Sequence, residues 1–457
     1  LPPVLAATQW LDGAHGDHAP EAARQAVTRM ERETGLTRGE ALPTARFAQV
    51  DRLTRFFTLP QTLPGHRRSA RIDRVLTGRY TAYPAMAALL GGVCCLTFHV
   101  VGPYLSRVLA HAIAWLADAA DGALLALDAR PLLRALVREG VFAGVGSVAA
   151  FLPVILALFF FLSLLEDTGY LARVAFVMDK LLRRIGLSGR SIVPLLIGFG
   201  CSVPAIMATR TVSSDRDRKM TILLTPYMSC SAKISIYAFF TAAFFPQYGA
   251  LVMIALYLLG ILIGIVAALI MNHTAFRGKP VPFVMELPNY RLPSAKSVGL
   301  LLWEKAKDFL QRAFTVIFLA TIIIWFLQGF DTRLNAVADS SYSLLALIGQ
   351  WIAPLFAPLG FADWRCATAL ISGFVAKESV VSTLEVLLGG AAVTGMFSPR
   401  AAISFLVFTL LYTPCVAAIA TIRRELGSTV KTVGVVILQC GVAWLVGWLA
   451  YAITGLF

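Results

Sequence analysis

Residues 191–211 read SIVPLLIGFGCSVPAIMATRT, an apolar stretch interrupted by two prolines and two glycines. A regular helix does not fit this stretch, because proline removes a backbone hydrogen bond and glycine weakens a helix interior. Basic residues lie on both sides of it, with Arg190 before the stretch and Arg210 at its end. A segment that begins and ends on one side of a membrane is typical of a broken, re-entrant helix. We therefore predict such an element here.

The composition indicates that this element belongs to an integral membrane protein. Hydrophobic residues make up 58% of the 457 residues and charged residues only 14%, whereas a soluble chain carries about 25% charged residues. The net charge of +14 is spread over short basic clusters between apolar runs, as in cytoplasmic loops, which argues against a nucleic-acid partner. Seven cysteines, most of them in apolar runs, are expected to be reduced thiols. Residues 1–40 lack the apolar core of a signal peptide.

The apolar runs predict an all-α, polytopic membrane fold with seven or eight transmembrane helices. A helix needs about 20 apolar residues to cross the hydrocarbon core. Residues 108–137 are amphipathic and acidic, so we place them at the opposite surface or as a re-entrant piece. Residues 366–390 form the second broken element, because Lys377 and Glu378 interrupt an apolar setting. The spans expected to be continuous are 81–105, 140–165, 220–245, 249–271, 313–330, 401–422 and 433–457.

The order of these segments predicts two membrane halves related by an inverted repeat. GFGCSVPA is followed by TPYMSC in the first half, and GFVAKESV is followed by YTPCVAA in the second. Paired interrupted segments in corresponding positions indicate the central site of a transporter. The predicted divisions are a cytoplasmic segment, a first membrane half, a basic cytoplasmic connector and a second membrane half, at residues 1–79, 80–272, 273–312 and 313–457 respectively.

Three cysteines mark candidate metal ligands at these interruptions. Cys201 directly follows the glycine break, Cys230 stands two residues after Met228, and Cys415 directly follows Pro414. Backbone groups freed at membrane depth persist only where protein or a water-filled cavity satisfies them. Thiol and thioether sulfur suits a divalent transition metal. The alternative is that a buried cysteine is a small hydrophobe, and this interpretation is preferred for Cys94, Cys95, Cys366 and Cys440.

Charged residues at membrane depth are costly and mark further candidates. Glu166 and Asp167 end an apolar run and are placed to collect a hydrated cation at a cavity mouth, although Asp167 equally suits an N-cap of the next helix. Lys377 and Glu378 are adjacent and point to different faces of a helix. Lys377 is expected either to form a gate-locking ion pair or to extend its ammonium to the interface. Lys233 would repel a cation unless it is paired or turned outward.

Two common kinds of catalytic site are missing from the sequence. No HExxH or CxxC pattern occurs, which argues against a preformed zinc site or a metalloprotease. The only Gly-Lys pair, at Gly278, is followed by Pro280, so no phosphate-binding loop is present. We therefore do not expect this chain to be an enzyme.

Four stretches resemble, in order, the two Gate regions of FeoB, the family of bacterial ferrous-iron transporters. They contain LIGFGCSVPA, TPYMSCSAK, FVAKESV and YTPCVAA, and lie within residues 162–211, 217–240, 374–388 and 411–428. Residues 8–27 are similar to the tail of the helical domain that follows the family's GTP-binding domain. Two departures stand out, because Ser202 replaces the usual asparagine and CSAKISIY replaces a sequence nearer CGARLPVY.

The resemblance implies a metal route and a set of gating residues. The family's proposed route falls on the three cysteines, and the residues we expect along it are Cys201, Cys230, Cys415, Met228, Ser202, Glu166 and Asp167. The expected gating and ion-pair residues are Lys377, Glu378, Pro204, Pro226 and Pro414.

The resemblance also implies function and partners. The transported substrate would be Fe²⁺, the location the bacterial cytoplasmic membrane, and GTP would bind only to an N-terminal G domain that this sequence lacks. Expected partners are membrane lipids, small cytoplasmic Feo accessory proteins, that G domain and a second copy of the chain in a homo-oligomer. Two alternatives stay open: a carrier for another solute such as a nucleoside, and a membrane assembly or signalling protein without transport.

Overall fold

The chain divides into two units, residues 1–68 and residues 69–457. The described part of the first unit includes helical residues 47–53 and the start of helix α4, Pro64–Leu76. The remainder of the fold concerns the second unit. The computed structural model describes, apart from short isolated stretches, residues 64–78, 80–127, 142–276, 288–291, 293–309, 315–333, 340–388 and 392–455.

The second unit is built from α-helices joined by short turns, which confirms the predicted all-α class. Its helices are α5 Ala82–Cys95, α6 Gly102–Ala126, α8 Ala143–Asp167, α9 Tyr170–Arg184, α10 Ile192–Gly198, α11 Ser202–Ala208, α12 Asp215–Leu224, α13 Ser231–Phe244, α14 Gly249–His273, α15 Ala295–Phe309, α16 Thr315–Gly329, α17 Leu344–Ile352, α18 Trp364–Val375, α19 Ser379–Leu388, α20 Pro399–Leu411, α21 Val416–Leu426 and α22 Thr429–Ile453.

Four helical stretches within the described residues are long and apolar enough to cross a membrane, which supports the predicted polytopic class. Two bent pairs raise the number to six if each is one span: α8 with α9, bent by 82°, and α17 and its following turn with α18, bent by 104°. Seven or eight spans were expected from the apolar runs. The numbers differ because some of those runs are broken or short, as with the 15 residues of α16. The four stretches are Ala82–Ala126, Gly249–His273, Pro399–Leu426 and Thr429–Ile453.

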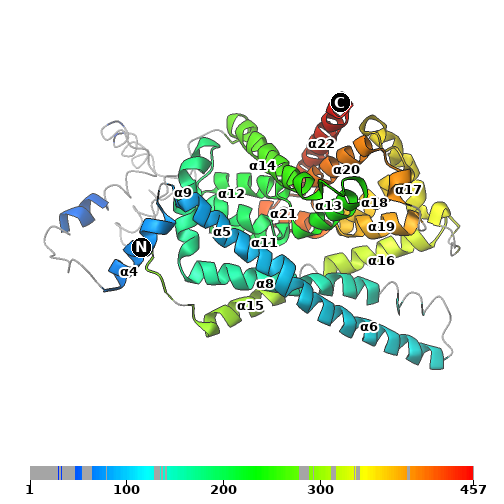
Figure 1. Ribbon diagram of the computed structural model, residues 1–457, viewed down its shortest axis with the longest axis horizontal. Helices are drawn as coiled ribbons and strands as arrows, with labels where there is room; N and C mark the ends of the chain where they lie inside the picture. The colour runs from blue at the N-terminus through cyan, green and yellow to red at the C-terminus, as the bar shows by residue number, and fades with distance from the viewer. Residues whose placement is uncertain are drawn as a thin grey trace. The chain divides into compact units, whose positions relative to one another are not determined.

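The first span continues far beyond its expected end. Helix α5 passes through a π-helical segment, Leu96–Val101, directly into α6, and Figure 1 shows the two as one long rod. The prediction of a separate piece beginning at residue 108 was wrong for residues 108–126, which continue the helix of the first span, while most of residues 128–137 lie outside the described residues. Wider π-type bonding, with the Gly102 amide donating to the Thr97 carbonyl, keeps the chain helical ahead of Pro103. The 45-residue rod is about 68 Å long at 1.5 Å per residue.

Both predicted broken elements are broken where expected. Helix α10 ends at Gly198, and α11 begins at Ser202 after a turn through Cys201. Helix α18 ends at Val375, and α19 begins at Ser379.

Two further breaks interrupt segments that we expected to be continuous spans, although the second of these segments, within Pro399–Leu426, still qualifies as one candidate membrane span. In residues 220–245, α12 ends at Leu224 and a 3-10 turn precedes α13; in residues 401–422, α20 ends at Leu411 and α21 begins at Val416. The reason is local, because Pro226 and Pro414 lack a backbone N–H and disfavour helical conformation in the preceding residue. Each membrane half therefore contains two breaks.

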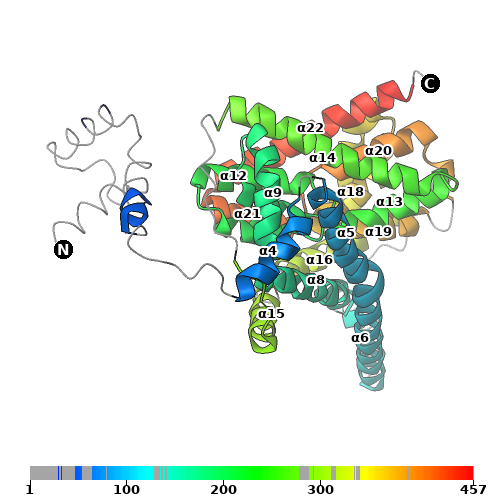
Figure 2. The same ribbon diagram turned by 60° about the vertical axis from the view of Figure 1, so that its left-hand side comes forward.

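The half-helices of the two halves pack in crossed pairs. Helix α11 contacts α21, and α13 contacts α19, so each pair joins one half to the other. Within the first half α12 contacts α14, and within the second half α20 contacts α22 in the corresponding position. Helices α14 and α22 lie along the same side of the unit in both Figure 1 and Figure 2. This correspondence is what an internal two-fold repeat produces.

Aromatic packing fixes the position of α13 against α20. The Phe240 ring of α13 lies 5.0 Å from Phe405 and 5.2 Å from Phe397, measured between ring centroids. Phe361 and Phe408 extend the cluster on the far side of α20. Each aromatic pair adds about 0.5–1.5 kcal/mol beyond its area burial. The start of α13 is thereby held beside the end of α20, where two of the four breaks lie.

Candidate functional site

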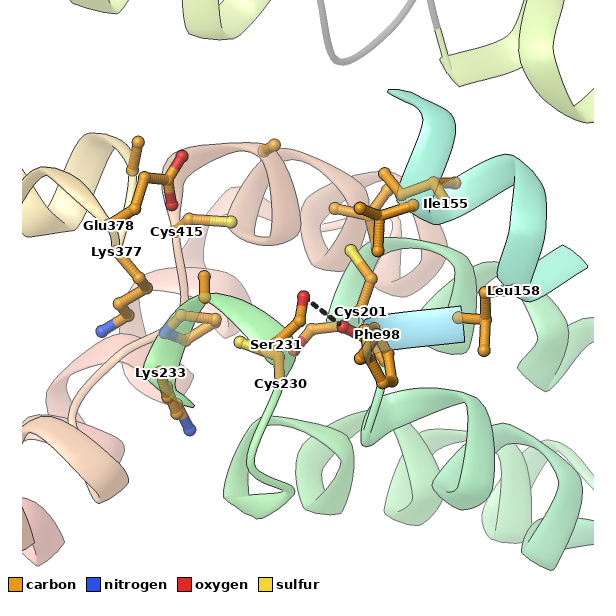
Figure 3. Close-up of a pocket in the computed structure, with 18 of the residues that line it drawn as sticks. Phe98, Ile155, Leu158, Cys201, Cys230, Ser231, Lys233, Lys377, Glu378 and Cys415 are labelled. Atoms are coloured by element: carbon orange, nitrogen blue, oxygen red, sulfur yellow. Dashed lines mark hydrogen bonds between the residues drawn. The ribbon is translucent and has the colours of Figure 1, made fainter. Parts of the chain in front are cut away.

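A cavity of about 90 Å³ lies where the four helix breaks meet. A water molecule needs roughly 10–15 Å³ of such volume, so the cavity has room for several waters or a partly hydrated ion. All four breaks contribute to its lining, and α8 and the π-helical segment complete it (Figure 3). The lining residues are Phe98, Val154, Ile155, Leu158, Gly200, Cys201, Ser202, Val203, Cys230, Ser231, Ala232, Lys233, Val375, Ala376, Lys377, Glu378, Pro414, Cys415 and Ala417.

Each break places a sulfur- or carboxylate-bearing residue directly before the helix that follows. Cys201, Cys230 and Cys415 precede α11, α13 and α21, all with extended backbone conformation. Glu378 directly precedes α19 as well, but it lies in a turn rather than in extended backbone. Figure 3 shows the Glu378 carboxylate beside Cys415, with Cys201 farther along the cavity. The sequence singled out the three cysteines as a set, but the place of Glu378 as their fourth counterpart appears only in the structure.

These groups do not form a closed metal site in this conformation. Within the part of the chain that the structure describes, no three His, Cys, Asp or Glu side chains are grouped closely enough to hold a metal ion. The four groups are instead spread along the wall of the cavity (Figure 3).

The carbonyl freed at the first break is satisfied within the cavity wall. The Gly200 oxygen accepts hydrogen bonds from the amide and the hydroxyl of Ser231, each at 3.1 Å, and Figure 3 draws the second of them. A side chain at Gly200 would place its Cβ only 2.2 Å from the Leu158 methyl Cδ2, so the Leu158 side chain would have to move to admit it. These hydrogen bonds connect the break between α10 and α11 to the break between α12 and α13. They therefore hold Cys201 near Cys230.

Lys377 brings an amine to the cavity wall without an ion pair among the described residues. Its side chain is 3% exposed, and its Nζ lies 2.8 Å from the ring centroid of Tyr412. The ammonium has no hydrogen-bond partner among the described residues. The geometry is therefore a cation–π contact, rather than the ion pair or interfacial position expected from the sequence. The gating role of Lys377 and Glu378 stays a prediction.

The remaining predicted residues divide between the cavity wall and the protein core. Ser202 and Pro414 line the cavity. Met228 is buried but does not line the cavity. Its terminal methyl packs against Gly264 of α14, 3.2 Å from the position that a Cβ on this glycine would take. Pro204 is buried in the first turn of α11, and Pro226 is buried in the turn between α12 and α13.

Glu166 and Asp167 lie outside the cavity lining. Both are exposed at the end of α8, just before the 82° bend into α9. Asp167 does not cap α9, because the N-cap is Gly169 with a φ of 79°, a left-handed conformation that favours glycine. Their role in a metal route stays a prediction from the sequence.

A polar cluster of Asp73, Arg173 and Tyr290 was not anticipated. Arg173 of α9 pairs through two nitrogens with the Asp73 carboxylate of α4 and stacks on the ring of Tyr290, 3.9 Å from its centroid. The Tyr290 hydroxyl also donates to Asp73, at 3.0 Å. Burial alone would raise the pKa of Asp73, but the hydrogen bonds from Arg173 and Tyr290 outweigh it and lower that pKa. No sequence pattern relates these residues, because Arg173 lies 100 positions and Tyr290 217 positions after Asp73.

Comparison with known families agrees with this arrangement of breaks. The Gate family model, described as "Nucleoside recognition", matches residues 148–244 and 310–429, which contain all four breaks. The model described as "Ferrous iron transport protein B C terminus" matches residues 253–305 between them. The chain belongs to the FeoB family.

Several FeoB proteins are similar over most of the chain. The Fe(2+) transporter FeoB of Staphylococcus aureus (strain MSSA476) is 38% identical over 401 residues, covering 85% of this chain and 60% of that protein. FeoB of Methanocaldococcus jannaschii is 35% identical over 370 residues, covering 78% and 54%. The "Fe(2+) transport protein A/Fe(2+) transporter FeoB fusion protein" of Porphyromonas gingivalis is 36% identical over 446 residues, covering 85% and 52%. The chain thus spans 52% to 60% of the length of these FeoB relatives.

Proposed function

We propose that this chain forms the membrane pathway of a ferrous-iron importer in the bacterial cytoplasmic membrane. The observation that carries the proposal is the convergence of Cys201, Cys230 and Cys415 on one cavity, although they come from three separate breaks. The names of the FeoB relatives, which are Fe²⁺ transporters, support Fe²⁺ as the substrate.

The chemistry of the cavity suits stepwise exchange of hydration water. Thiol sulfur is a softer ligand than water and favours transition metals over Mg²⁺ or Ca²⁺. Because the sulfurs of Cys201, Cys230 and Cys415 start three different half-helices, an ion meets them in succession. The carboxylate of Glu378 offers a harder ligand next to Cys415. In this proposal the exposed Glu166 and Asp167 attract the hydrated ion before it enters.

Nucleotide coupling and partners also belong to the proposal. The FeoB relatives are longer than this chain, and we propose that a GTP-binding domain of the whole protein biases the breaks between open and closed arrangements. The Porphyromonas gingivalis relative is named as a fusion with Fe(2+) transport protein A, which supports a small Feo accessory protein as partner. Membrane lipids and a second copy of the chain complete the proposed partners.

A nucleoside carrier is the second candidate, because the Gate model is described as "Nucleoside recognition". A base and a ribose call for amide hydrogen-bonding groups and aromatic surfaces. The described lining of the cavity contains no amide side chain and a single aromatic ring, that of Phe98. The lining therefore favours an ion.

Replacement of single cysteines tests the proposal. Cys201→Ser and Cys230→Ser keep the size of the side chain but remove the soft ligand. We expect each to lower uptake of radioactive iron by the full-length transporter about tenfold, since losing ~1.4 kcal/mol of binding costs that factor. Cys95→Ser is the matched control, because Cys95 is exposed on α5 and outside the cavity lining. Uptake at the wild-type rate in both cavity variants would refute thiol ligation.

A further inference from the structure

Lys233, in the first turn of α13, is buried at 2% exposure although its side chain ends in an amine. Its Nζ donates to three backbone carbonyls: Pro226 at 3.0 Å, Met228 at 3.3 Å and Leu410 at 2.6 Å. An ammonium group has three N–H donors and no acceptor. Its hydrogen-bonding capacity is therefore used in full by the protein backbone.

The helix breaks are the reason why these carbonyls are available. In a regular helix the Leu410 carbonyl would accept from the amide of residue 414. That residue is Pro414, which has no N–H. The carbonyls of Pro226 and Met228 belong to the turn between α12 and α13, where Met228 is already extended with a ψ of 138°. Each break would leave acceptors unsatisfied if Lys233 were absent.

The three acceptors come from both membrane halves. Pro226 and Met228 belong to the first half, whereas Leu410 lies 177 positions away from Lys233, at the end of α20. Cys230 stands three residues before Lys233, and Cys415 stands five residues after Leu410. One ammonium group thus connects the break that holds Cys230 to the break that leads to Cys415.

We infer that Lys233 is a tethered cation, whose ammonium fills a three-carbonyl site between the two halves that a free monovalent cation would otherwise occupy. Backbone carbonyls that converge on one positive centre are the means by which proteins replace the hydration shell of K⁺. Three carbonyls at 2.6–3.3 Å from one nitrogen have the arrangement that an ammonium ion requires. If the Lys233 ammonium were removed, the ligand that fits the three-carbonyl site would therefore be NH₄⁺ or K⁺.

A fixed charge at this position has two consequences for the cavity. It holds the break between α12 and α13 at a constant separation from the break between α20 and α21. Lys233 is therefore a positioning residue for Cys230 and Cys415. It also keeps a passing cation from settling on these carbonyls, because like charges repel. Neither consequence depends on which solute crosses the membrane, so the inference stands apart from the proposed function.

Lys233→Met tests the inference by removing the ammonium while keeping an unbranched side chain. The full-length protein is unfolded by heat in ammonium chloride, potassium chloride or tetramethylammonium chloride at equal ionic strength. We expect the variant to unfold at a lower temperature than wild type in tetramethylammonium, which is too large for the site. Ammonium or potassium should then raise that temperature selectively, by roughly 2–4 °C.

The matched control is Lys219→Met, which removes an exposed ammonium that pairs with Asp215 on α12. It should show no selective response to ammonium. A Lys233→Met variant as stable as wild type, or with one unfolding temperature in all three salts, would overturn the inference. A selective response together with unchanged iron uptake would instead count against the positioning role alone.

Two further measurements decide the matter if Lys233→Met does not fold. Adding Pro414→Ala supplies an N–H for the Leu410 carbonyl, so the double variant should recover folded protein. In the wild-type protein, Lys233 should resist acetylation long after Lys219 has reacted, as followed by mass spectrometry. Equal acetylation rates at the two lysines, or a double variant no better folded than Lys233→Met, would contradict the inference.

Discussion

Single residues at the helix ends determine what the cavity offers a ligand. The three cysteines could be selected from the sequence because each stands beside a proline, a glycine or a polar run in an apolar segment. Glu378 was recognised as a buried charge but not as the counterpart of the cysteines, because its position depends on where α19 begins. Lys233 donates to the distant Leu410 carbonyl as well as to two nearby carbonyls, and Lys377 contacts the ring of Tyr412. Sequence spacing carries no information about the long-range contacts.

The cluster of Asp73, Arg173 and Tyr290 predicts how stability depends on pH. The pKa of Asp73 is lower in the folded protein than in the unfolded chain, so its contribution is present in full above the unfolded value of about 3.9. That contribution is lost as the pH falls through the folded pKa. Asp73→Asn should therefore lower the free energy of unfolding at neutral pH, by about 1–2 kcal/mol since the 21% exposure of the carboxylate screens the pair.

Chemical unfolding at a series of pH values measures this effect. The difference between wild type and Asp73→Asn should shrink as the pH falls below about 4. Asp118→Asn is a suitable control, because Asp118 is 67% exposed and pairs only loosely with Arg138, at 3.3 Å. A difference that stays constant from neutral to acidic pH would mean that the carboxylate charge does not stabilise this cluster.

At the scale of helices, proline and glycine decide where membrane segments end. The breaks after α10 and α18 could be predicted because glycines or adjacent charges interrupt apolar runs. At the two Thr-Pro pairs the sequence predicts continuous spans rather than breaks. A proline inside a long apolar run kinks some helices and ends others. Tertiary contacts decide between these outcomes. The π-helical joint between α5 and α6 had no sequence signal, since it preserves the helix through Gly102 and Pro103.

Helix α14 holds the second break in place by close approach, and this predicts the effect of one methyl group. A Cβ on Gly260 would lie 2.8 Å from the Tyr227 carbonyl in the turn before Cys230. Because that neighbour is backbone, the turn must shift, at a cost of about 1–3 kcal/mol. We expect Gly260→Ala to lower the unfolding temperature and to reduce iron uptake by the full-length transporter.

Gly434→Ala on α22 is the control for this change, because nothing lies within 4 Å of its added Cβ. It should leave both stability and iron uptake near the wild-type values. Equal behaviour of the two alanine variants would show that α14 does not position the break.

At the scale of the molecule, the two halves meet through their broken helices. The crossed contacts of α11 with α21 and of α13 with α19 bring four separate stretches of sequence to one cavity. The Arg210–Glu425 ion pair connects the ends of α11 and α21 in the same manner, with Nε 3.0 Å from the carboxylate. The sequence predicted paired interruptions, whereas their convergence follows from packing across the whole unit.

We propose that Cys201, Cys230 and Cys415 face a water-filled route through which Fe²⁺ passes. Alkylation of the full-length protein by a small maleimide under anaerobic conditions, with and without Fe²⁺, tests it most directly when each cysteine is followed by mass spectrometry. We predict that Cys201, Cys230 and Cys415 react and that Fe²⁺ slows all three, while exposed Cys95 reacts equally fast in both conditions. Cavity cysteines that stay unmodified, or that react at the same rate with and without Fe²⁺, would contradict the account.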